Sequence, residues 1–148
     1  MKRTQKRFPR YILMINRINE EGRPIIFYDG VCGLCNRFID FILRKDKRGN
    51  FLFAPLQGTK AMELGISLDR YHSMVLWHEG KILIKSTAAL TILTQLPGIF
   101  RLTKLFLYIP GILRDFVYGF IARDRYLWFG VKEHCRVPTE EERFRFLA

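Results

Sequence analysis

Apolar side chains along this chain recur with two different spacings, and the change between them marks the first two elements. Residues 25–28 are consecutive β-favouring apolar residues that end at the turn-forming pair Asp29-Gly30, so they predict a short buried strand. From Cys35 onward, apolar residues recur three and four positions apart with charged residues between them, which is the spacing of an amphipathic helix. Basic residues and Gly49 mark the expected end of this helix.

Beyond this helix, the pattern predicts further short strands and helices. We expect a strand at 51–56, a short helix at 60–64, a hairpin with strands at 74–77 and 82–84 and a turn at Glu79-Gly80, and a helix capped by Ser86 or Thr87. A strand–helix–strand unit followed by a hairpin and a helix predicts an α/β fold, in which helices cover the faces of a mixed sheet.

The segment from 100 to 129 is rich in large apolar and aromatic residues spaced three and four apart, with interruptions at Pro110-Gly111 and Gly119. This spacing predicts two or three amphipathic helices. Such helices would either cover the domain's own sheet or lie on an anionic membrane surface. We favour the first arrangement, because a small sheet needs covering.

Length and composition favour one domain. The chain has 148 residues, of which 49% are hydrophobic, and this is enough for one core. We expect a basic N-terminal extension at 1–23 and a single domain at 24–148. The apolar run at 11–15 is too short for a secretory signal and is followed by Arg17, and no uninterrupted apolar stretch reaches the length of a membrane span. We therefore expect a cytoplasmic protein.

Charge suggests the kind of partner without naming one. The 25 lysines and arginines exceed the 14 acidic residues by +11, so the chain would be attracted to polyanions such as nucleic acid, anionic lipid or acidic proteins. The same charge also fits a basic surface that only keeps the protein soluble. Because no nucleic-acid-binding motif accompanies the charge, we do not expect nucleic acid as a partner.

Two of the three cysteines, Cys32 and Cys35, form a C-x-x-C motif at the junction of the first strand and the first helix. A strand, C-x-x-C and helix in this order are typical of a thioredoxin-like redox site. A helix N-terminus favours the thiolate of Cys32 through its unpaired N–H groups and the helix dipole. Cys35 lies one turn later on the same face, so the pair predicts a nucleophile and a resolving thiol in disulfide exchange.

The two cysteines and Asp29 allow other interpretations as well. A zinc site needs four ligands, and the nearest second pair is His134-Cys135, whose adjacent side chains chelate poorly, so we expect no metal and no other cofactor. Both cysteines could instead be small core residues. Asp29 fits a helix cap or a turn, but it also fits a buried proton acceptor for one of the thiols.

The segment 25–57 strongly resembles the start of the DCC family of thiol-disulfide oxidoreductases, which is marked by the motif D-x-x-C-x-x-C. Asp29, Cys32 and Cys35 match this motif one for one. The blocks SMVLWHEGKILIKSTAALTIL and FIARDRYLWFGVKEHCRVPTEEERFRFL also look like the family. The resemblance implies a thioredoxin-like fold, disulfide oxidoreductase activity, and a role for Cys135 in redox chemistry or in packing against the site.

One position departs from the thioredoxin pattern. Thioredoxins have a cis-proline before the strand that faces the C-x-x-C motif, whereas this chain has His72-Ser73 there, and Ser73 would leave the site more open. The leading hypothesis is a protein-disulfide reductase that acts on a disulfide-containing protein or a small thiol. The alternative is a non-catalytic basic module of the same fold that binds an anionic membrane or a partner protein.

Overall fold

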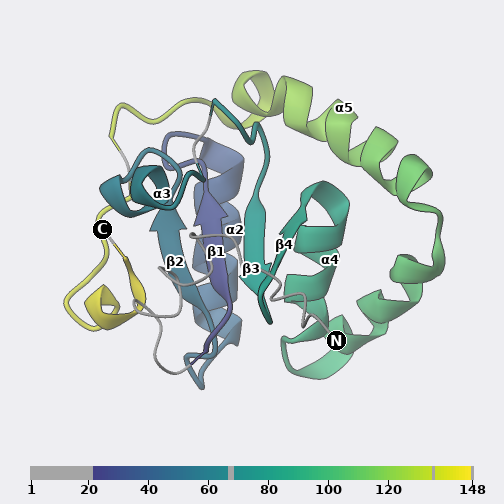
Figure 1. Ribbon diagram of the computed structural model, residues 1–148, viewed down its shortest axis with the longest axis horizontal. Helices are drawn as coiled ribbons and strands as arrows, with labels where there is room; N and C mark the ends of the chain where they lie inside the picture. Colours follow the sequence, from purple (N-terminus) through teal and green to yellow (C-terminus); the bar gives the residue numbers. More distant parts are fainter. Residues whose placement is uncertain (1–21, 67–68, 135, 148) are drawn as a thin grey trace, which may run out of the picture.

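The computed structural model describes residues 22–66, 69–134 and 136–147 (Figure 1). Most of the basic segment 1–23 therefore lies outside the described residues. The described chain is an α/β fold whose elements follow in the order β1 (Ile25–Tyr28), α2 (Gly33–Lys45), β2 (Leu52–Pro55), α3 (Thr59–Glu63), β3 (Val75–His78), β4 (Lys81–Ile84), α4 (Lys85–Thr94), the 3₁₀ helix η1 (Gly98–Tyr108), α5 (Gly111–Phe129) and η2 (Arg143–Arg145).

The four strands form one mixed sheet in the order β2-β1-β3-β4, which confirms the predicted α/β class. β1 pairs in parallel with β2 because α2 carries the chain back between them, and the other two pairings are antiparallel. The hairpin turn lies at Glu79 and Gly80, as predicted, and their φ angles of 49° and 75° are those of a tight primed turn.

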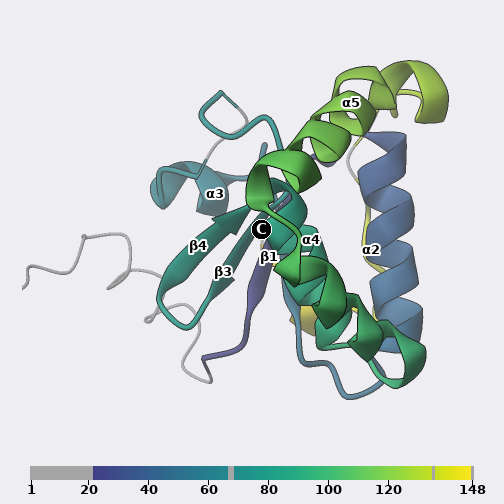
Figure 2. The ribbon, with the colours of Figure 1, turned by 90° about the vertical axis from the view of Figure 1, so that its right-hand side faces the viewer.

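The core lies on both faces of this sheet, because alternate residues of each strand point to opposite sides. On one face, Ile26 and Tyr28 pack with residues of α2 and α4, and on the other face Ile25 and Phe27 pack with residues of α3 (Figure 2). All four side chains of β1 are buried. β1 is therefore a fully buried interior strand, and the motif that follows it continues directly from the core.

One helix start agrees with the prediction and another differs from it. α2 begins at Gly33 with Cys32 at its N-cap, so the helix includes Cys35 in its first turn. The predicted cap of α4 by Ser86 or Thr87 is wrong, because β4 continues directly into the helix and the N-cap residue is Ile84. Ser86 instead donates a hydrogen bond to Asp115 of α5.

Two helices, η1 and α5, follow α4 as expected, but the prediction that they cover the sheet is wrong. They form an arc around α4, and α5 also contacts α2 (Figures 1 and 2). Gly119 lies inside α5 and does not interrupt it. No single helix among the described residues is long and apolar enough to cross a membrane. Together, η1 and α5 have the length and apolar composition of a membrane span, but they are bent by 118° at the break between them.

The end of the chain returns to the open edge of β2. The amide of Leu147 donates a hydrogen bond to the carbonyl of Phe53 at 2.7 Å, and the ring of Phe146 stacks on that of Phe53. The buried side chain of Arg145 pairs with the buried carboxylate of Asp46 at 2.6 Å. This C-terminal segment therefore fastens the loop between α2 and β2 to the sheet.

Candidate functional site

The two cysteines of the motif lie where β1 meets α2. Cys32 is the N-cap residue of α2, with extended backbone angles, and Cys35 follows in the first helical turn. Both side chains are buried, Cys32 completely and Cys35 to all but 8% of its surface. The helix N-terminus offers unpaired N–H groups to an anion at this position.

The environments of the two thiols shift their pKa values in opposite directions. A hydrogen bond from the Cys35 thiol, helped by backbone N–H groups and the charge of Arg125, lowers the pKa of Cys32 from 9.0 to about 6, although burial opposes this. The same hydrogen bond, burial and the negative charge of the Cys32 thiolate raise the pKa of Cys35. At neutral pH the pair therefore consists of one thiolate and one thiol.

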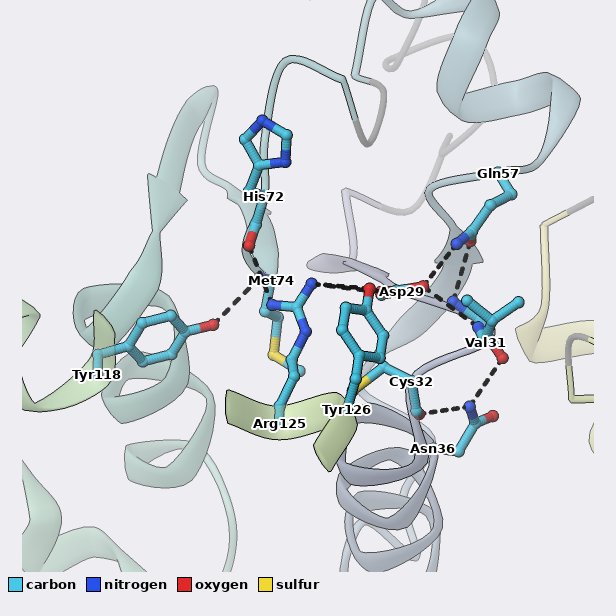
Figure 3. A network of polar contacts seen from close by, with 11 residues as sticks. Asp29, Val31, Cys32, Asn36, Gln57, His72, Met74, Tyr118, Arg125 and Tyr126 are labelled. Atoms are coloured by element: carbon cyan, nitrogen blue, oxygen red, sulfur yellow. Dashed lines mark hydrogen bonds and ion pairs between the residues drawn. The ribbon is translucent and has the colours of Figure 1, made fainter. Parts of the chain in front are cut away.

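The carboxylate of Asp29 is almost completely buried and is held on both oxygens (Figure 3). Its Oδ1 accepts hydrogen bonds from the Val31 amide at 3.2 Å and from Nε2 of Gln57 at 2.5 Å. Its Oδ2 faces Arg125 at 3.3 Å and accepts a hydrogen bond from the Tyr126 hydroxyl. Asp29 thus stabilises the turn before the motif, as one interpretation predicted, but it does not cap α2, since no side chain caps that helix.

Arg125 brings a positive charge into the site from α5, which is distant in sequence. Its guanidinium is buried, donates to the carbonyl of His72 at 3.0 Å and pairs with Asp29. A buried cation needs such an anionic partner, because removal from water is costly. The ion pair therefore fixes the guanidinium close enough to the sulfurs to favour the anion of Cys32.

The segment that precedes β3 faces α5. Ser73 is buried and its hydroxyl donates to the carbonyl of Met74 at 3.4 Å, and no cis peptide bond occurs in the described ranges. The Met74 amide donates to the hydroxyl of Tyr118 at 3.2 Å (Figure 3). With the His72 carbonyl bound to Arg125, two backbone groups of this segment are already hydrogen-bonded to α5.

Two cavities lie on either side of Tyr118 and Arg125, which line both, and a cysteine lines only the smaller one. The smaller one, of about 270 Å³, is bordered by Cys35 and is otherwise mainly apolar. The larger one, of about 700 Å³, is bordered by Ser73 and by basic side chains of which Lys85 is one. A substrate that reaches Cys35 through the smaller cavity would therefore contact mostly apolar side chains.

Residues 130–132, which we call the strap, cross over the motif after α5 ends. The amide of Gly33 donates to the carbonyl of Gly130 at 3.1 Å, and the amide of Lys132 donates to the carbonyl of Val31 at 2.7 Å. A Cβ atom at position 33 would lie 2.0 Å from the carbonyl oxygen of Phe129. Gly33 is thus required for this close crossing, which covers Cys32.

The remaining predicted site features are placed as follows. Within the described ranges, no group of three or more His, Cys, Asp or Glu side chains is arranged to hold a metal ion. Cys35 and Cys32 are free thiols. Cys135 lies outside the described residues, so its predicted role stays a prediction.

Sequence reasoning missed several residues that complete the site, namely Asn36, Gln57, Tyr118, Arg125 and Tyr126. Asn36 donates to the carbonyls of Gly30 and Cys32, at 2.8 Å each, and so supports the backbone around the motif. The only signal for Arg125 was a basic residue in an apolar helix. Helical spacing does not show which of several arginines points inward.

Comparisons with known proteins agree with this geometry. A family model described as DCC1-like thiol-disulfide oxidoreductase matches residues 26–131, which is most of the chain. The chain belongs to this DCC1-like family. Family membership and the mixed sheet with its motif at the β1–α2 junction confirm the resemblance that the sequence suggested.

Two relatives support the same assignment. The "Uncharacterized protein YuxK" of Bacillus subtilis (strain 168) is 40% identical over 127 residues, which cover 83% of this chain and 93% of that protein. The "DCC family protein At1g52590, chloroplastic" of Arabidopsis thaliana is 34% identical over 123 residues, which cover 80% of this chain and 72% of that protein. No solved structure matches the chain significantly.

Proposed function

We propose that this DCC1-like protein is a thiol-disulfide oxidoreductase of the protein-disulfide reductase type, with Cys32 as nucleophile and Cys35 as resolving thiol. The observation that carries this proposal is the position of the two free thiols at the N-cap and in the first turn of α2, beside the buried Arg125. This environment shifts the two thiol pKa values in opposite directions. With a pKa of about 6, Cys32 is mainly thiolate at pH 7. Family membership supports the redox role.

The reaction has two exchange steps. The Cys32 thiolate attacks one sulfur of a substrate disulfide, forms a mixed disulfide and releases the other substrate sulfur as a thiolate. Cys35 then loses its proton to solvent or to the leaving thiolate and attacks the Cys32 sulfur. This releases the second substrate thiolate and leaves a Cys32–Cys35 disulfide, so two electrons pass from the protein to the substrate. An external thiol reductant returns the pair to the dithiol state.

Arg125 and Asp29 act as positioning residues in this scheme. The charge of Arg125 stabilises the Cys32 thiolate, while Asp29 holds the guanidinium in place. The negative charge of Asp29 also contributes to the raised pKa of Cys35. Cys35 therefore stays protonated and hydrogen-bonded to Cys32 until the first exchange has removed the thiolate charge.

Substrate access requires movement of the chain around Cys32. The Cys32 side chain is fully buried beneath the strap, whereas Cys35 borders the smaller cavity. A disulfide of a protein or of a small thiol reaches Cys32 only when the strap or the neighbouring end of α5 moves aside. Movement of the strap breaks its two backbone hydrogen bonds to the motif, and movement of the end of α5 also breaks the contacts of Arg125 and Tyr126 with Asp29.

Trapping of the mixed disulfide tests the proposal. In a Cys35→Ser variant, the first exchange occurs but the second cannot, so a peptide disulfide accumulates as an adduct on Cys32 that mass spectrometry detects. A Cys32→Ser variant should form far less adduct at position 35. Repeating both experiments with Cys135→Ser added separates an adduct on Cys135 from one on Cys32. Equal disulfide reduction by the parent and the Cys32→Ser variant would refute the proposal.

A further inference from the structure

The outer side of η1 and α5 carries large apolar side chains that the described part of the chain leaves in contact with solvent. Six of them expose at least 65% of their surface, namely Ile99, Leu105, Tyr108, Ile112, Phe116 and Leu127. We call the outer side of these two helices the apolar face. Soluble monomers rarely expose large contiguous apolar patches, and such patches mark interaction sites.

The apolar face is not the packing side of its helices. The inner side of α5 carries Arg125, which is the only buried residue of the two helices, and Tyr118, which reaches the segment before β3. η1 and α5 pack on α4, and α4 packs on the sheet. A mainly apolar cavity of about 470 Å³ remains between η1, α5 and α4, whereas the apolar face points away from these contacts and has no packing partner within the described chain.

Charge on the same helices favours an anionic partner. Arg101 and Lys104 of η1 are exposed beside the apolar side chains, and the exposed Arg123 of α5 is paired with Asp124. The two acidic residues of these helices are both engaged, since Asp115 accepts a hydrogen bond from Ser86 and Asp124 pairs with Arg123. The face is therefore apolar and basic together, in a chain whose net charge is +11.

We propose that the apolar face is a membrane-docking surface that lies on a bilayer containing anionic lipids. Helices that combine an apolar side with lysine and arginine bind in the plane of the bilayer interface, where aromatic residues such as Tyr108 and Trp128 are favoured. Because η1 and α5 are bent by 118° at the break between them, they do not form one straight membrane-spanning helix. A second copy of this chain would bring like charges together, so charge favours lipid over self-association.

This docking is independent of the redox chemistry, but it places the dithiol near the bilayer. α5 contacts the site with Arg125 and carries the apolar face on its other side. The thiols then lie roughly one helix diameter, about 10 Å, from the lipid surface. Disulfides of membrane-attached proteins are the substrates that such a location would favour.

Vesicle binding by the full-length chain tests the docking surface. We expect the protein to float with vesicles of phosphatidylcholine and phosphatidylglycerol and to bind phosphatidylcholine alone much more weakly. Trp128 is 54% exposed and Trp77 only 3%, so brominated lipids should quench Trp128 emission while Trp77 supplies a constant background. Release by alkaline carbonate is expected for a protein that lies on the surface.

Paired variants locate the contact. Replacement of two exposed residues, Ile112→Ser with Phe116→Ser, should weaken vesicle binding about tenfold or more without loss of the fold, since about two buried apolar side chains are lost. Met62→Ser, on α3, is 62% exposed and serves as the control that should not change binding. These exposed positions carry no core contacts, so folding is preserved in each variant.

A second pair separates local charge from net charge. Arg101→Glu with Lys104→Glu should weaken binding to anionic vesicles by about tenfold or more, because each basic residue near the surface contributes about 1 kcal/mol, or about fivefold. Lys47→Glu with Arg48→Glu, in the exposed loop after α2, changes the net charge equally and should have a much smaller effect.

Four outcomes would overturn the proposal. These are the absence of vesicle binding, equal binding by the apolar-face variants and their controls, resistance to carbonate extraction, and a soluble dimer that the Ile112→Ser and Phe116→Ser changes dissociate while vesicles are not bound. Equal binding by the apolar-face variants and their controls would assign the lipid contact to another part of the chain. A soluble dimer that these changes dissociate would assign the apolar face to a second copy. A failed disulfide-trapping experiment would leave vesicle binding unchanged, so the two proposals fail separately.

Discussion

Cys32 and Cys35 are identical side chains that differ in which groups surround their sulfur atoms. Cys32 accepts hydrogen bonds at the helix N-terminus. Cys35 donates a hydrogen bond to Cys32, and the negative charge of Cys32 raises the pKa of Cys35. Arg125 lies near both and lowers the pKa of each. The asymmetry of the pair therefore depends on the helix start and on a residue 90 positions further along the chain.

The first prediction concerns pH dependence. Only the thiolate is alkylated, so the rate of Cys32 alkylation should fall as pH drops through about 6 and should be nearly constant above pH 7. Arg125→Met removes a charge that stabilises the thiolate, so the midpoint should move to higher pH. Mass spectrometry of the labelled peptide measures the rate. Arg123→Met, an exposed position of the same helix, should leave the midpoint unchanged, and a midpoint above 8 in the parent chain would contradict the assignment.

The second prediction concerns the buried ion pair. Asp29→Asn leaves the buried guanidinium of Arg125 without its anion, which should cost on the order of 3 kcal/mol of unfolding free energy. Asp124→Asn removes the carboxylate of an ion pair whose arginine is exposed, and it should change stability much less. Urea denaturation of the reduced proteins measures both values. Equal losses would mean that the Asp29 contacts do not stabilise the fold.

At the scale of elements, the strap and the start of α2 depend on one glycine. Gly33→Ala would place a Cβ atom 2.0 Å from the Phe129 carbonyl oxygen, so the end of α5 has to move. We expect a loss of about 1–3 kcal/mol, as for other overpacked positions, together with faster alkylation of Cys32 because its cover is displaced. Thermal unfolding and the alkylation rate at fixed pH measure these effects.

Gly119 is the matched control for this change. It lies inside α5, and a Cβ atom there would meet no other atom within 4 Å. Gly119→Ala should therefore leave Cys32 alkylation unchanged and stabilise the protein slightly, by about 0.5–1 kcal/mol, through its better helix propensity. If both glycine variants alkylate at the parent rate, the strap does not control access to Cys32.

The elements that were predictable from the sequence are those with local signals. The run at 25–28 and the turn at Glu79-Gly80 specify a strand and a hairpin by themselves, and the structure has both. The cap of α4 was not predictable, because Ser86 has a typical capping side chain but is used by Asp115 of another helix. Amphipathic spacing correctly predicted η1 and α5 as helices, yet it does not say which surface they pack on.

The candidate site was predictable only in part for the same reason. Asp29 and the cysteines lie in one short motif, so their proximity follows from the local sequence. Arg125, Tyr126 and Gln57 reach Asp29 only through tertiary packing. Neither spacing nor composition distinguishes Arg125 from the exposed Arg123 two residues earlier, since the difference is the side of α5 on which each lies.

At the scale of the whole molecule, the C-terminal segment packs against the loop between α2 and β2. Arg145 donates to the carbonyl of Phe51 at 3.2 Å as well as to the carboxylate of Asp46. Both partners lie in the loop that links α2 to β2. A segment that is last in the sequence thus holds the connection between the motif helix and the parallel edge of the sheet.

Removal of the buried ion pair between Arg145 and Asp46 should destabilise the entire domain. Arg145→Met breaks a buried ion pair and leaves the Asp46 carboxylate with fewer partners, so we expect a loss of about 3–5 kcal/mol in unfolding free energy. Arg143→Met removes an arginine that is 63% exposed and pairs with an exposed glutamate, and its effect should be below about 1 kcal/mol. Denaturant unfolding compares the two. Equal stability of both variants would show that the segment does not hold the loop.

α5 connects the chemistry and the surface of the molecule. Its inner side supplies Arg125 and Tyr126 to the Asp29 network, and its outer side belongs to the apolar face. The proposed lipid contact on one side of the helix and the proposed thiol chemistry on the other are therefore separated only by the thickness of α5. A mutation on the outer side should change vesicle binding and a mutation on the inner side thiol reactivity, because the two sets of residues do not overlap.

The reduction potential of the Cys32–Cys35 pair tests the central claim most directly. The full-length protein is equilibrated over a series of glutathione redox buffers, with Cys135 intact and replaced by serine, and the dithiol and disulfide forms are quantified by alkylation and mass spectrometry. The account predicts a reversible two-electron transition between Cys32 and Cys35 that occurs both with Cys135 present and with Cys135→Ser. If no disulfide between Cys32 and Cys35 forms at any glutathione ratio, the account is contradicted.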